Sequence, residues 1–201
     1  MENNKENITN NNVPVQSKFK KFIKDGWDLL KFAIIALLIV IPIRMFIAQP
    51  FVVSGESMFP TFHDGEYLIV DELSYIIGNP SRGDVIVFRY PNDTKRFFIK
   101  RIIGLPNEEI SIEKGEVTIK NKENPNGFKL TEPYIDEPFD TTTSFKTGAN
   151  EYFVLGDNRN RSSDSRVWGT LPKDLIIGRA YLRLLPYEKV SYLPGAYKES
   201  K

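Results

Sequence analysis

The stretch Phe97-Phe98-Ile99-Lys100-Arg101-Ile102-Ile103 decides the fold class of this chain. Aromatic and β-branched residues dominate it, as they do in β-strands. Because successive side chains of a strand point to opposite faces, Lys100 should share one face with Phe98 and Ile102. The sequence therefore predicts a strand that carries a lysine among apolar neighbours.

Similar short runs recur from residue 49 onward, separated by turn signals such as Gly78-Asn79-Pro80. The predicted strands cover residues 67–70, 84–88, 97–103, 116–119, 151–155 and 176–185. Helical periodicity is weak in this part of the chain, so we expect a mainly β protein with an antiparallel sheet or barrel-like domain over residues 49–190. Residues 121–150 should form a loop-rich excursion, and residues 191–201 a C-terminal tail.

The N-terminal part has a different composition. Residues 1–17 are polar and Asn-rich, which predicts a disordered tail. Residues 18–48 begin with several lysines and continue with an apolar segment from Leu29 to Ala48, and about 20 helical residues can cross a bilayer core of about 30 Å. The lysines before this segment predict an N-terminus in the cytoplasm and a following domain outside it.

Two other interpretations of the apolar segment are a buried core helix and a cleaved secretion signal. Phe46-Ile47-Ala48 does not have the small-x-small pattern of a cleavage site. Together with the length of the segment and its basic flank, this favours an uncleaved, single-pass transmembrane helix.

The overall composition narrows the possible functions. The 201 residues are 41% hydrophobic and carry a net charge of +1, which fits one main domain and gives no electrostatic footprint for nucleic acid. The absence of cysteine excludes disulfides, thiolate zinc sites and a cysteine nucleophile. We expect neither a metal nor a cofactor.

Ser57, in Ser54-Gly55-Glu56-Ser57-Met58-Phe59-Pro60-Thr61, lies just beyond the apolar segment and is a candidate nucleophile. A reactive serine needs a neighbour that removes its proton, and a lysine can do this on several unrelated folds. Lys100 is the candidate base, since burial can lower a lysine pKa by up to about 3–5 units. In the alternative interpretation Ser57 is a turn hydroxyl, and the aliphatic stem of Lys100 is buried while its amine reaches solvent.

Two other serine-based sites are disfavoured. Gly55-Glu56-Ser57-Met58-Phe59 departs from the Gly-x-Ser-x-Gly nucleophile elbow at its last position. His63 is the only histidine of the chain, and its context Phe62-His63-Asp64-Gly65 favours a solvated loop residue over a base.

Four segments resemble the motifs of type I signal peptidases, which are membrane-anchored serine proteases that remove signal peptides from exported proteins. In the order of that family, they are residues 54–61, 82–88, 100–106 and 156–166, and the resemblance runs from about Lys18 to Pro186. It implies that Ser57 is the nucleophile and Lys100 the general base, in agreement with the interpretation of the residues themselves.

The resemblance assigns roles to seven further residues. Ser162 matches a serine that hydrogen-bonds and orients the lysine, and Asp164 and Arg166 match a supporting pair near the site. Pocket positions that accept small side chains one and three residues before the cut are matched by Phe51, Val53, Val87 and Ile99. Strand alternation, however, puts Ile99 on the face opposite Lys100.

The chain departs from the family pattern at three places. Position 55, where some members carry a serine that completes the oxyanion hole, is glycine. The backbone N–H of Ser57 is then one expected donor, and a backbone group, Ser54 or water would supply the other. Asn160-Arg161 replaces an Asp-Asn pair, and any second domain is absent or reduced to residues 121–150.

The resemblance implies an enzyme of the bacterial plasma membrane that cleaves signal peptides from preproteins after Ala-x-Ala type sites. Its expected partners are preprotein signal peptides and the lipid bilayer, with the secretion translocon nearby. Two alternatives are a self-cleaving repressor-type Ser-Lys protease, which would carry a DNA-binding half, and a catalytically silent, membrane-tethered β-domain that binds exported proteins.

Overall fold

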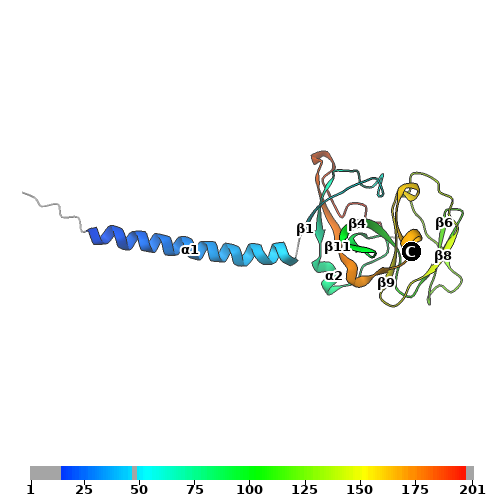
Figure 1. Cartoon of the computed structure of the whole chain (residues 1–201), viewed down its shortest axis with the longest axis horizontal. Helices are drawn as coiled ribbons and strands as arrows, with labels where there is room; N and C mark the ends of the chain where they lie inside the picture. Colours follow the sequence, from blue (N-terminus) through cyan, green and yellow to red (C-terminus); the bar gives the residue numbers. More distant parts are fainter. Residues whose placement is uncertain (1–14, 47–48, 198–201) are drawn as a thin grey trace, which may run out of the picture. The chain divides into compact units, whose positions relative to one another are not determined.

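The computed structural model of the protein describes residues 15–46 and 49–197, with side chains for residues 22–40 and 49–197 (Figure 1). Most of the predicted N-terminal tail and residues 198–201 lie outside the described residues. The chain divides into two compact units, with the boundary between Ile43 and Arg44.

Helix α1, Val15–Phe46, covers most of the predicted membrane anchor. Nearly all of its described side chains are exposed, among them apolar residues such as Phe32 and Leu38. Among the described residues, none of the helices combines the length and apolar character that a membrane crossing requires. The transmembrane anchor therefore stays a prediction.

The second unit is built mainly from antiparallel strands, which confirms the prediction of a mainly β domain. Its main sheet has the strand order β1-β2-β11-β3-β4-β9-β10, and β12 pairs with β11. The strands are β1 (Gln49–Val52), β2 (Tyr67–Asp71), β3 (Val85–Tyr90), β4 (Asp93–Gly104), β9 (Glu151–Leu155), β10 (Leu171–Pro172), β11 (Ile176–Leu185) and β12 (Ser191–Tyr192).

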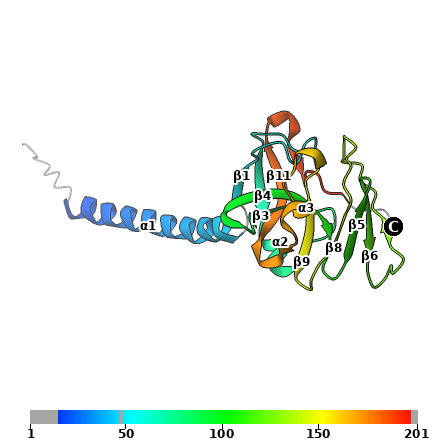
Figure 2. The same cartoon turned by 45° about the vertical axis from the view of Figure 1, so that its right-hand side comes forward.

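A smaller sheet has the order β7-β6-β5-β8 and lies beside the main sheet (Figure 2). Its strands are β5 (Glu109–Glu113), β6 (Glu116–Lys120), β7 (Phe128–Lys129) and β8 (Thr143–Lys146). Ile110 and Ile119 of this sheet share a core with Ile103 and Phe153 of the main sheet. The predicted excursion at residues 121–150 thus contains two strands, β7 and β8, as well as loops.

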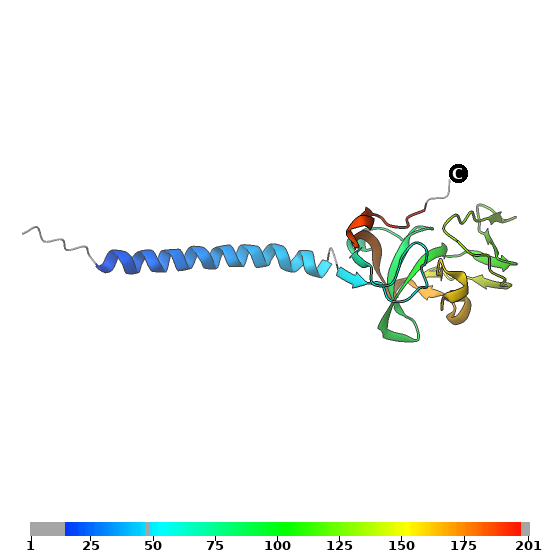
Figure 3. The same cartoon turned by 90° about the horizontal axis from the view of Figure 1, so that it is seen from above.

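Five short helical turns connect the strands. They are α2 (Leu73–Ile77), η1 (Arg159–Arg161), α3 (Ser165–Trp168), η2 (Lys173–Leu175) and η3 (Tyr187–Lys189). After β12 the chain, in red in Figure 3, runs from the main sheet toward the smaller one. There the Tyr197 and Tyr134 rings meet edge to face, with their centroids 5.7 Å apart.

All six predicted strands are present. Two of them, β9 and β11, have the predicted bounds, while β4 begins four residues before its predicted start at Phe97. The strands that were not predicted are β1, β5, β7, β8, β10 and β12, and each has five residues or fewer. Among them, β1 contains Pro50, a residue that is disfavoured in strands except at sheet edges.

The two faces of β3 and β4 pack into separate hydrophobic clusters, as strand alternation requires. Val85 belongs to one cluster, and Ile99 packs against it. Ile86 and Ile102 belong to the other cluster, and Phe98 packs against that one. The predicted placement of Phe98 and Ile102 on one face and Ile99 on the opposite face is therefore confirmed.

Candidate active site

Lys100 of β4 and Ser57 of the loop after β1 are in direct contact. The Lys100 amine donates to Ser57 Oγ over 2.7 Å and to the carbonyl oxygen of Ile99 over 2.8 Å. Lys100 is only 4% exposed, and its Nζ lies 5.3 Å from the centre of the Phe98 ring. The fold thus brings together the two residues that were predicted from positions 43 apart in the sequence.

Burial lowers the pKa of Lys100 to about 8, because the apolar surroundings disfavour the ammonium form. The carboxylates of Asp164 and Asp157 act in the opposite direction, but their effect is smaller. A lysine with this pKa is about one-tenth neutral at pH 7, whereas an unperturbed lysine is neutral in only about one molecule in 3,000. Lys100 can therefore exchange a proton near neutral pH.

The loop that carries Ser57 is held by contacts on both sides. The Val53 N–H donates to Glu66 O over 2.9 Å, and the Gly65 N–H donates to Val53 O over 2.9 Å. Between them, Gly55 has a φ of 87°, a conformation that glycine adopts without strain. The Gly55 N–H donates to the Asp64 carboxylate over 2.7 Å, which fixes the turn just before Ser57.

A cleft of about 460 Å³ opens in front of Ser57 and Lys100. All four residues predicted to form substrate pockets line it, namely Phe51, Val53, Val87 and Ile99. Ile99 reaches the cleft although its side chain packs on the opposite face of β4 from Phe98. The cleft is also lined by Ser54, which was considered as an oxyanion donor, and by Phe98, which was predicted beside Lys100. The lining residues that were not predicted at the site are Val52, Leu68, Arg96, Phe97 and Ser163.

Two strand edges border this cleft. Strand β1 pairs only with β2, and β4 pairs with β9 only from Arg101 onward, so residues 93–100 of β4 have no strand partner on that side within the described chain. The rings of Phe51 in β1 and Phe97 in β4 meet across the cleft with their centroids 5.5 Å apart. Unpaired edges of this kind can hydrogen-bond an added extended peptide.

Ser162 does not make the expected hydrogen bond to Lys100 in this structure. Its Oγ is buried and has no hydrogen-bond partner among the described residues. The hydroxyl instead packs against Gly156, where an added Cβ would come within 2.2 Å of Ser162 Oγ and 2.4 Å of Ser57 O. Glycine at position 156 therefore permits both Ser57 and Ser162 to lie close to its backbone.

Asp164 and Arg166 form the predicted ion pair, with Nε to Oδ1 and Nη2 to Oδ2 distances of 2.8 Å. The Asp164 carboxylate also accepts from the Arg166 N–H at the start of α3 and from the Gly156 N–H, each over 3.2 Å. The pair fixes the loop beside the site, and the negative charge of Asp164 favours the ammonium form of Lys100.

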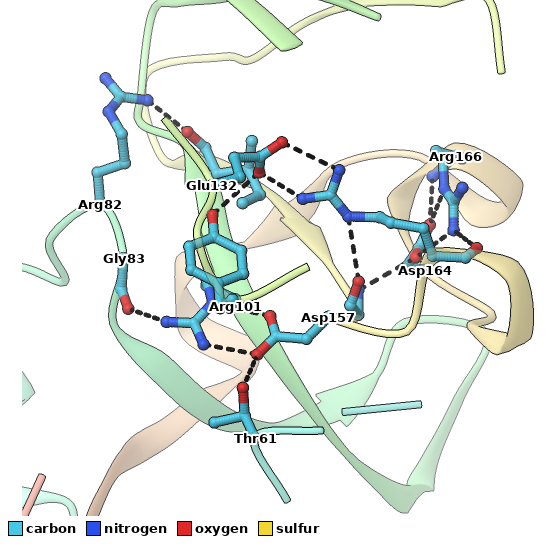
Figure 4. A network of polar contacts seen from close by, with 12 residues as sticks. Thr61, Arg82, Gly83, Arg101, Glu132, Asp157, Asp164 and Arg166 are labelled. Carbon is cyan, nitrogen blue, oxygen red and sulfur yellow. Dashed lines mark hydrogen bonds and ion pairs between the residues drawn. The ribbon is translucent and has the colours of Figure 1, made fainter. Parts of the chain in front are cut away.

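A buried ion pair next to Lys100 was missed in the sequence. Arg101 donates to Asp157 through Nε over 2.8 Å and through Nη2 over 2.6 Å, and also to Gly83 O over 2.9 Å (Figure 4). The Thr61 hydroxyl donates to the same carboxylate over 2.5 Å. Arg101 follows Lys100 in one motif segment, and Asp157 belongs to the segment around Ser162. A charged residue in each of these two segments was the available signal.

A second ion pair lies behind the first. Arg159 donates to the Glu132 carboxylate over 3.1 Å and to Gly156 O over 3.2 Å. The Tyr134 hydroxyl donates to Glu132 over 2.9 Å, and the Tyr134 ring lies 3.8 Å from the Arg101 guanidinium. These contacts connect the segment after β7 with the loop that follows β9.

His63 has other neighbours. Its Nδ1 lies 3.3 Å from Lys189 Nζ and 3.5 Å from the Glu66 carboxylate, and its side chain is 43% exposed. The interpretation as a loop residue is consistent with these contacts. Within the described part of the chain, no cluster of three or more histidine, aspartate or glutamate side chains is arranged to hold a metal ion.

Comparison with known proteins relates the chain to one family. A family profile described as "Signal peptidase, peptidase S26" matches residues 26–185. The chain is 39% identical to a signal peptidase I of Leptolyngbya laminosa over 173 residues, with 81% of this chain and 82% of the relative covered. It is 37% identical to a probable signal peptidase I-2 of Synechocystis over 199 residues, with 92% and 86% covered.

Among solved structures, a signal peptidase I from Enterococcus faecalis is 29% identical and matches with a TM-score of 0.44 over 50% of this chain and 96% of that chain. The family profile covers most of this chain, and the two relatives exceed 30% identity over most of their own length. The chain therefore belongs to the signal peptidase, peptidase S26, family of serine endopeptidases.

Proposed function

We propose that the protein is a membrane-anchored endopeptidase that removes signal peptides from exported preproteins with a Ser57–Lys100 dyad. The observation that carries this proposal is the 2.7 Å contact between Lys100 Nζ and Ser57 Oγ in a cleft where burial lowers the lysine pKa to about 8. No metal or cofactor takes part in the proposed reaction.

In the first step the neutral Lys100 amine accepts the Ser57 proton while Oγ attacks the scissile carbonyl. The tetrahedral intermediate collapses when the lysine ammonium gives this proton to the leaving amine, and an acyl-enzyme remains. The same amine then removes a proton from the water that attacks the ester, and it returns this proton to Ser57 Oγ as the acyl bond breaks and the product leaves. Lys100 thus acts alternately as base and acid.

The negative oxygen of each tetrahedral intermediate needs hydrogen-bond donors. We assign the backbone N–H of Ser57 as the first donor. The Gly55 N–H already donates to Asp64 over 2.7 Å, whereas Ser54 lines the cleft with its side chain exposed. We therefore assign the Ser54 hydroxyl as the second donor, in place of the side chain that glycine lacks at position 55.

The substrate is proposed to be an extended peptide that lies between the unpaired edges of β1 and β4. Alternate side chains of such a peptide point to the same side, so residues one and three before the cut would enter the cleft together. Phe51, Val53, Val87 and Ile99 provide apolar walls there. Because these side chains narrow the cleft, we expect it to accept substrates with small residues at these two positions, as in Ala-x-Ala sites.

We further propose that residues 18–48 anchor the chain in the bacterial plasma membrane, with the N-terminus in the cytoplasm and the β-domain outside it. The apolar run from Leu29 to Ala48 and the lysines before it support this topology. In intact spheroplasts, added protease should digest the β-domain. Digestion only after the membrane is broken would reverse the proposed orientation.

The function is tested by incubating the detergent-solubilised full chain with a preprotein that carries an Ala-x-Ala site. Ser57→Ala and Lys100→Ala should each abolish cleavage. Lys146→Ala is the matched control, because Lys146 is an exposed lysine of strand β8 outside the residues that line the cleft, and it should retain cleavage. Activity in Lys100→Ala together with its loss in His63→Ala would contradict the assignment of the base.

A further inference from the structure

Three consecutive residues at the candidate nucleophile are each tied to another segment. The Gly55 N–H donates to the Asp64 carboxylate over 2.7 Å. The Glu56 carboxylate accepts from the Arg161 guanidinium over 2.6 Å, and the Ser57 carbonyl accepts from the Asn158 N–H over 3.1 Å. Two of these three ties come from a single helical turn, η1, and the asparagine that caps it.

This turn is itself held firmly. The Asn158 side chain accepts from the Arg161 N–H over 3.2 Å, which closes the turn. Arg159, in the same turn, is buried and is bound to the Glu132 carboxylate and to Gly156 O. The side chain of Arg161 therefore extends toward Glu56 from a fixed backbone.

The Glu56–Arg161 pair differs from the other ties because water surrounds it. The side chains of Arg161 and Glu56 are 70% and 60% exposed, so the pair adds little to the stability of the fold and is weakened by salt. Its acidic member, Glu56, is nevertheless the residue directly before Ser57.

We propose that Arg161 is a positioning residue that, through Glu56, holds the Ser57 hydroxyl in line with Lys100 Nζ. The inference rests on the proposed Ser57–Lys100 dyad. Small displacements at a reacting centre change the rate strongly, whereas one exposed ion pair changes the folded state little. The pair should thus affect the rate of the chemical step without taking part in it.

The test measures preprotein cleavage by the solubilised full chain with Glu56→Gln, Arg161→Gln and the exchanged pair Glu56→Arg/Arg161→Glu. We expect each single variant to lower kcat by about tenfold with an unchanged KM, because the substrate still binds but the hydroxyl is misaligned. The exchanged pair restores the ionic contact and should recover kcat to within about twofold of the wild type. The melting temperature should stay the same in all three.

A matched control is available in the smaller sheet. Lys129 and Glu116 form a pair with the same 2.6 Å separation and side-chain exposures of 70% and 65%, outside the residues that line the cleft. Glu116→Gln and Lys129→Gln should leave kcat unchanged. Raising the salt from about 0.05 M to about 1 M should lower kcat in the wild type and in these controls, but not in Glu56→Gln or Arg161→Gln.

Several results would overturn the proposal. One is a wild-type kcat in the single variants. Another is a raised KM at constant kcat in these variants, which would mean that the pair contacts the substrate. A third is an exchanged pair that is no faster than the slower single variant. Ser57→Ala separates this inference from the proposed function. If Ser57→Ala retains cleavage, the dyad is wrong, whereas its inactivity beside fully active pair variants refutes only the positioning role.

Discussion

Lys100 and Arg101 are neighbouring cations on β4, and both are almost fully buried, yet their surroundings differ. Arg101 makes two hydrogen bonds to the Asp157 carboxylate and one to Gly83 O, so its charge is compensated. Within the part of the chain that the structure describes, the Lys100 amine hydrogen-bonds only to neutral oxygens, those of Ser57 and Ile99, and it lies near the Phe98 ring. The two side chains leave opposite faces of the same strand.

The difference shows that the type of cation and its hydrogen-bond partners together decide what a buried cation can do. An arginine guanidinium cannot act as a base in proteins, and the Asp157 carboxylate compensates its buried charge here. An amine without a carboxylate in contact loses part of its affinity for protons, and the pKa of Lys100 falls to about 8. One strand thus provides both a structural cation and a candidate base.

The largest effect that we expect is on activity. Lys100→Met keeps the length of the side chain but removes the amine, so cleavage should fall by about 10⁴-fold or more, while the free energy of unfolding stays the same or rises. Ser57→Ala should be equally inactive. Because the two residues act as one proton-transfer unit, the double variant should be no slower than either single variant.

Single-turnover cleavage assays and chemical unfolding of the same samples check this prediction. Arg101→Lys is the comparison variant on the other face of the strand, and it should fold less stably but keep measurable cleavage. A Lys100→Met protein that unfolds much more easily than the wild type would mean that Lys100, like Arg101, is a structural cation.

The second prediction concerns stability. Asp157→Asn leaves the buried Arg101 guanidinium without its counter-charge and should lower the free energy of unfolding by about 3–5 kcal/mol. Replacement of both partners by apolar residues, as in Arg101→Met/Asp157→Leu, should destabilise the protein less than Asp157→Asn does. Denaturant titrations measure both. Equal stability of Asp157→Asn and the wild type would contradict the role assigned to this pair.

A third prediction concerns Ile99, which directly precedes Lys100 in β4. Ile99 and Val87 are paired in the β3–β4 register, and both line the cleft. Preproteins with Leu or Phe directly before the cut should therefore be cleaved poorly, because fitting the larger side chain costs about 1–3 kcal/mol of transition-state binding. Val87→Ala should recover part of this loss, whereas Val117→Ala, in the core of the smaller sheet, should not. The measurement is kcat/KM for each substrate and variant. Efficient cleavage of the Leu substrate by the wild type would contradict the proposed pockets.

Much of this arrangement could be predicted from the sequence because it depends on local patterns. Alternation along β4 predicted that Phe98 and Ile102 lie on one face and Ile99 on the other, and the two hydrophobic clusters confirm it. The same patterns gave β9 and β11 their observed bounds, whereas β4 begins four residues before its predicted start. Strand β1 was missed because it has four residues, one of them proline, and its pairing with β2 depends on tertiary structure.

Contacts between distant segments could not be predicted in the same way. The partner of Arg101 lies 56 residues away, and no local pattern joins these two positions. The orientation of Ser162 depends on how closely Gly156 approaches it, which is also a tertiary property. The resemblance to a family predicted which residues belong to the site. Which of these residues are in contact depends on the packing of the chain.

Lys100 should also make stability depend on pH. Its pKa is lower in the folded state, about 8, than in the unfolded chain, about 10.4, so the unfolded state binds more protons between these values. The free energy of unfolding should therefore rise by about 3 kcal/mol from pH 8 to pH 10.4 and gain nothing from this group at lower pH. The difference between the wild type and Lys100→Met isolates this contribution, and parallel curves would show that the folded pKa is not lowered.

The smallest effect tests the cause of the lowered pKa. Phe98 lies beside the amine, and Phe98→Ser would let water reach it, so the pKa of Lys100 should rise toward its usual value. A rise of one unit lowers the neutral fraction at pH 7, and hence kcat/KM, by about tenfold. The rate of the wild type should increase with pH through about 8, and the acidic limb of Phe98→Ser should lie at higher pH. Phe98→Leu keeps the site dry and is the control, with a limb near that of the wild type. If Phe98→Ser leaves the limb in place, then exclusion of water by this face of β4 is not what separates Lys100 from an ordinary lysine.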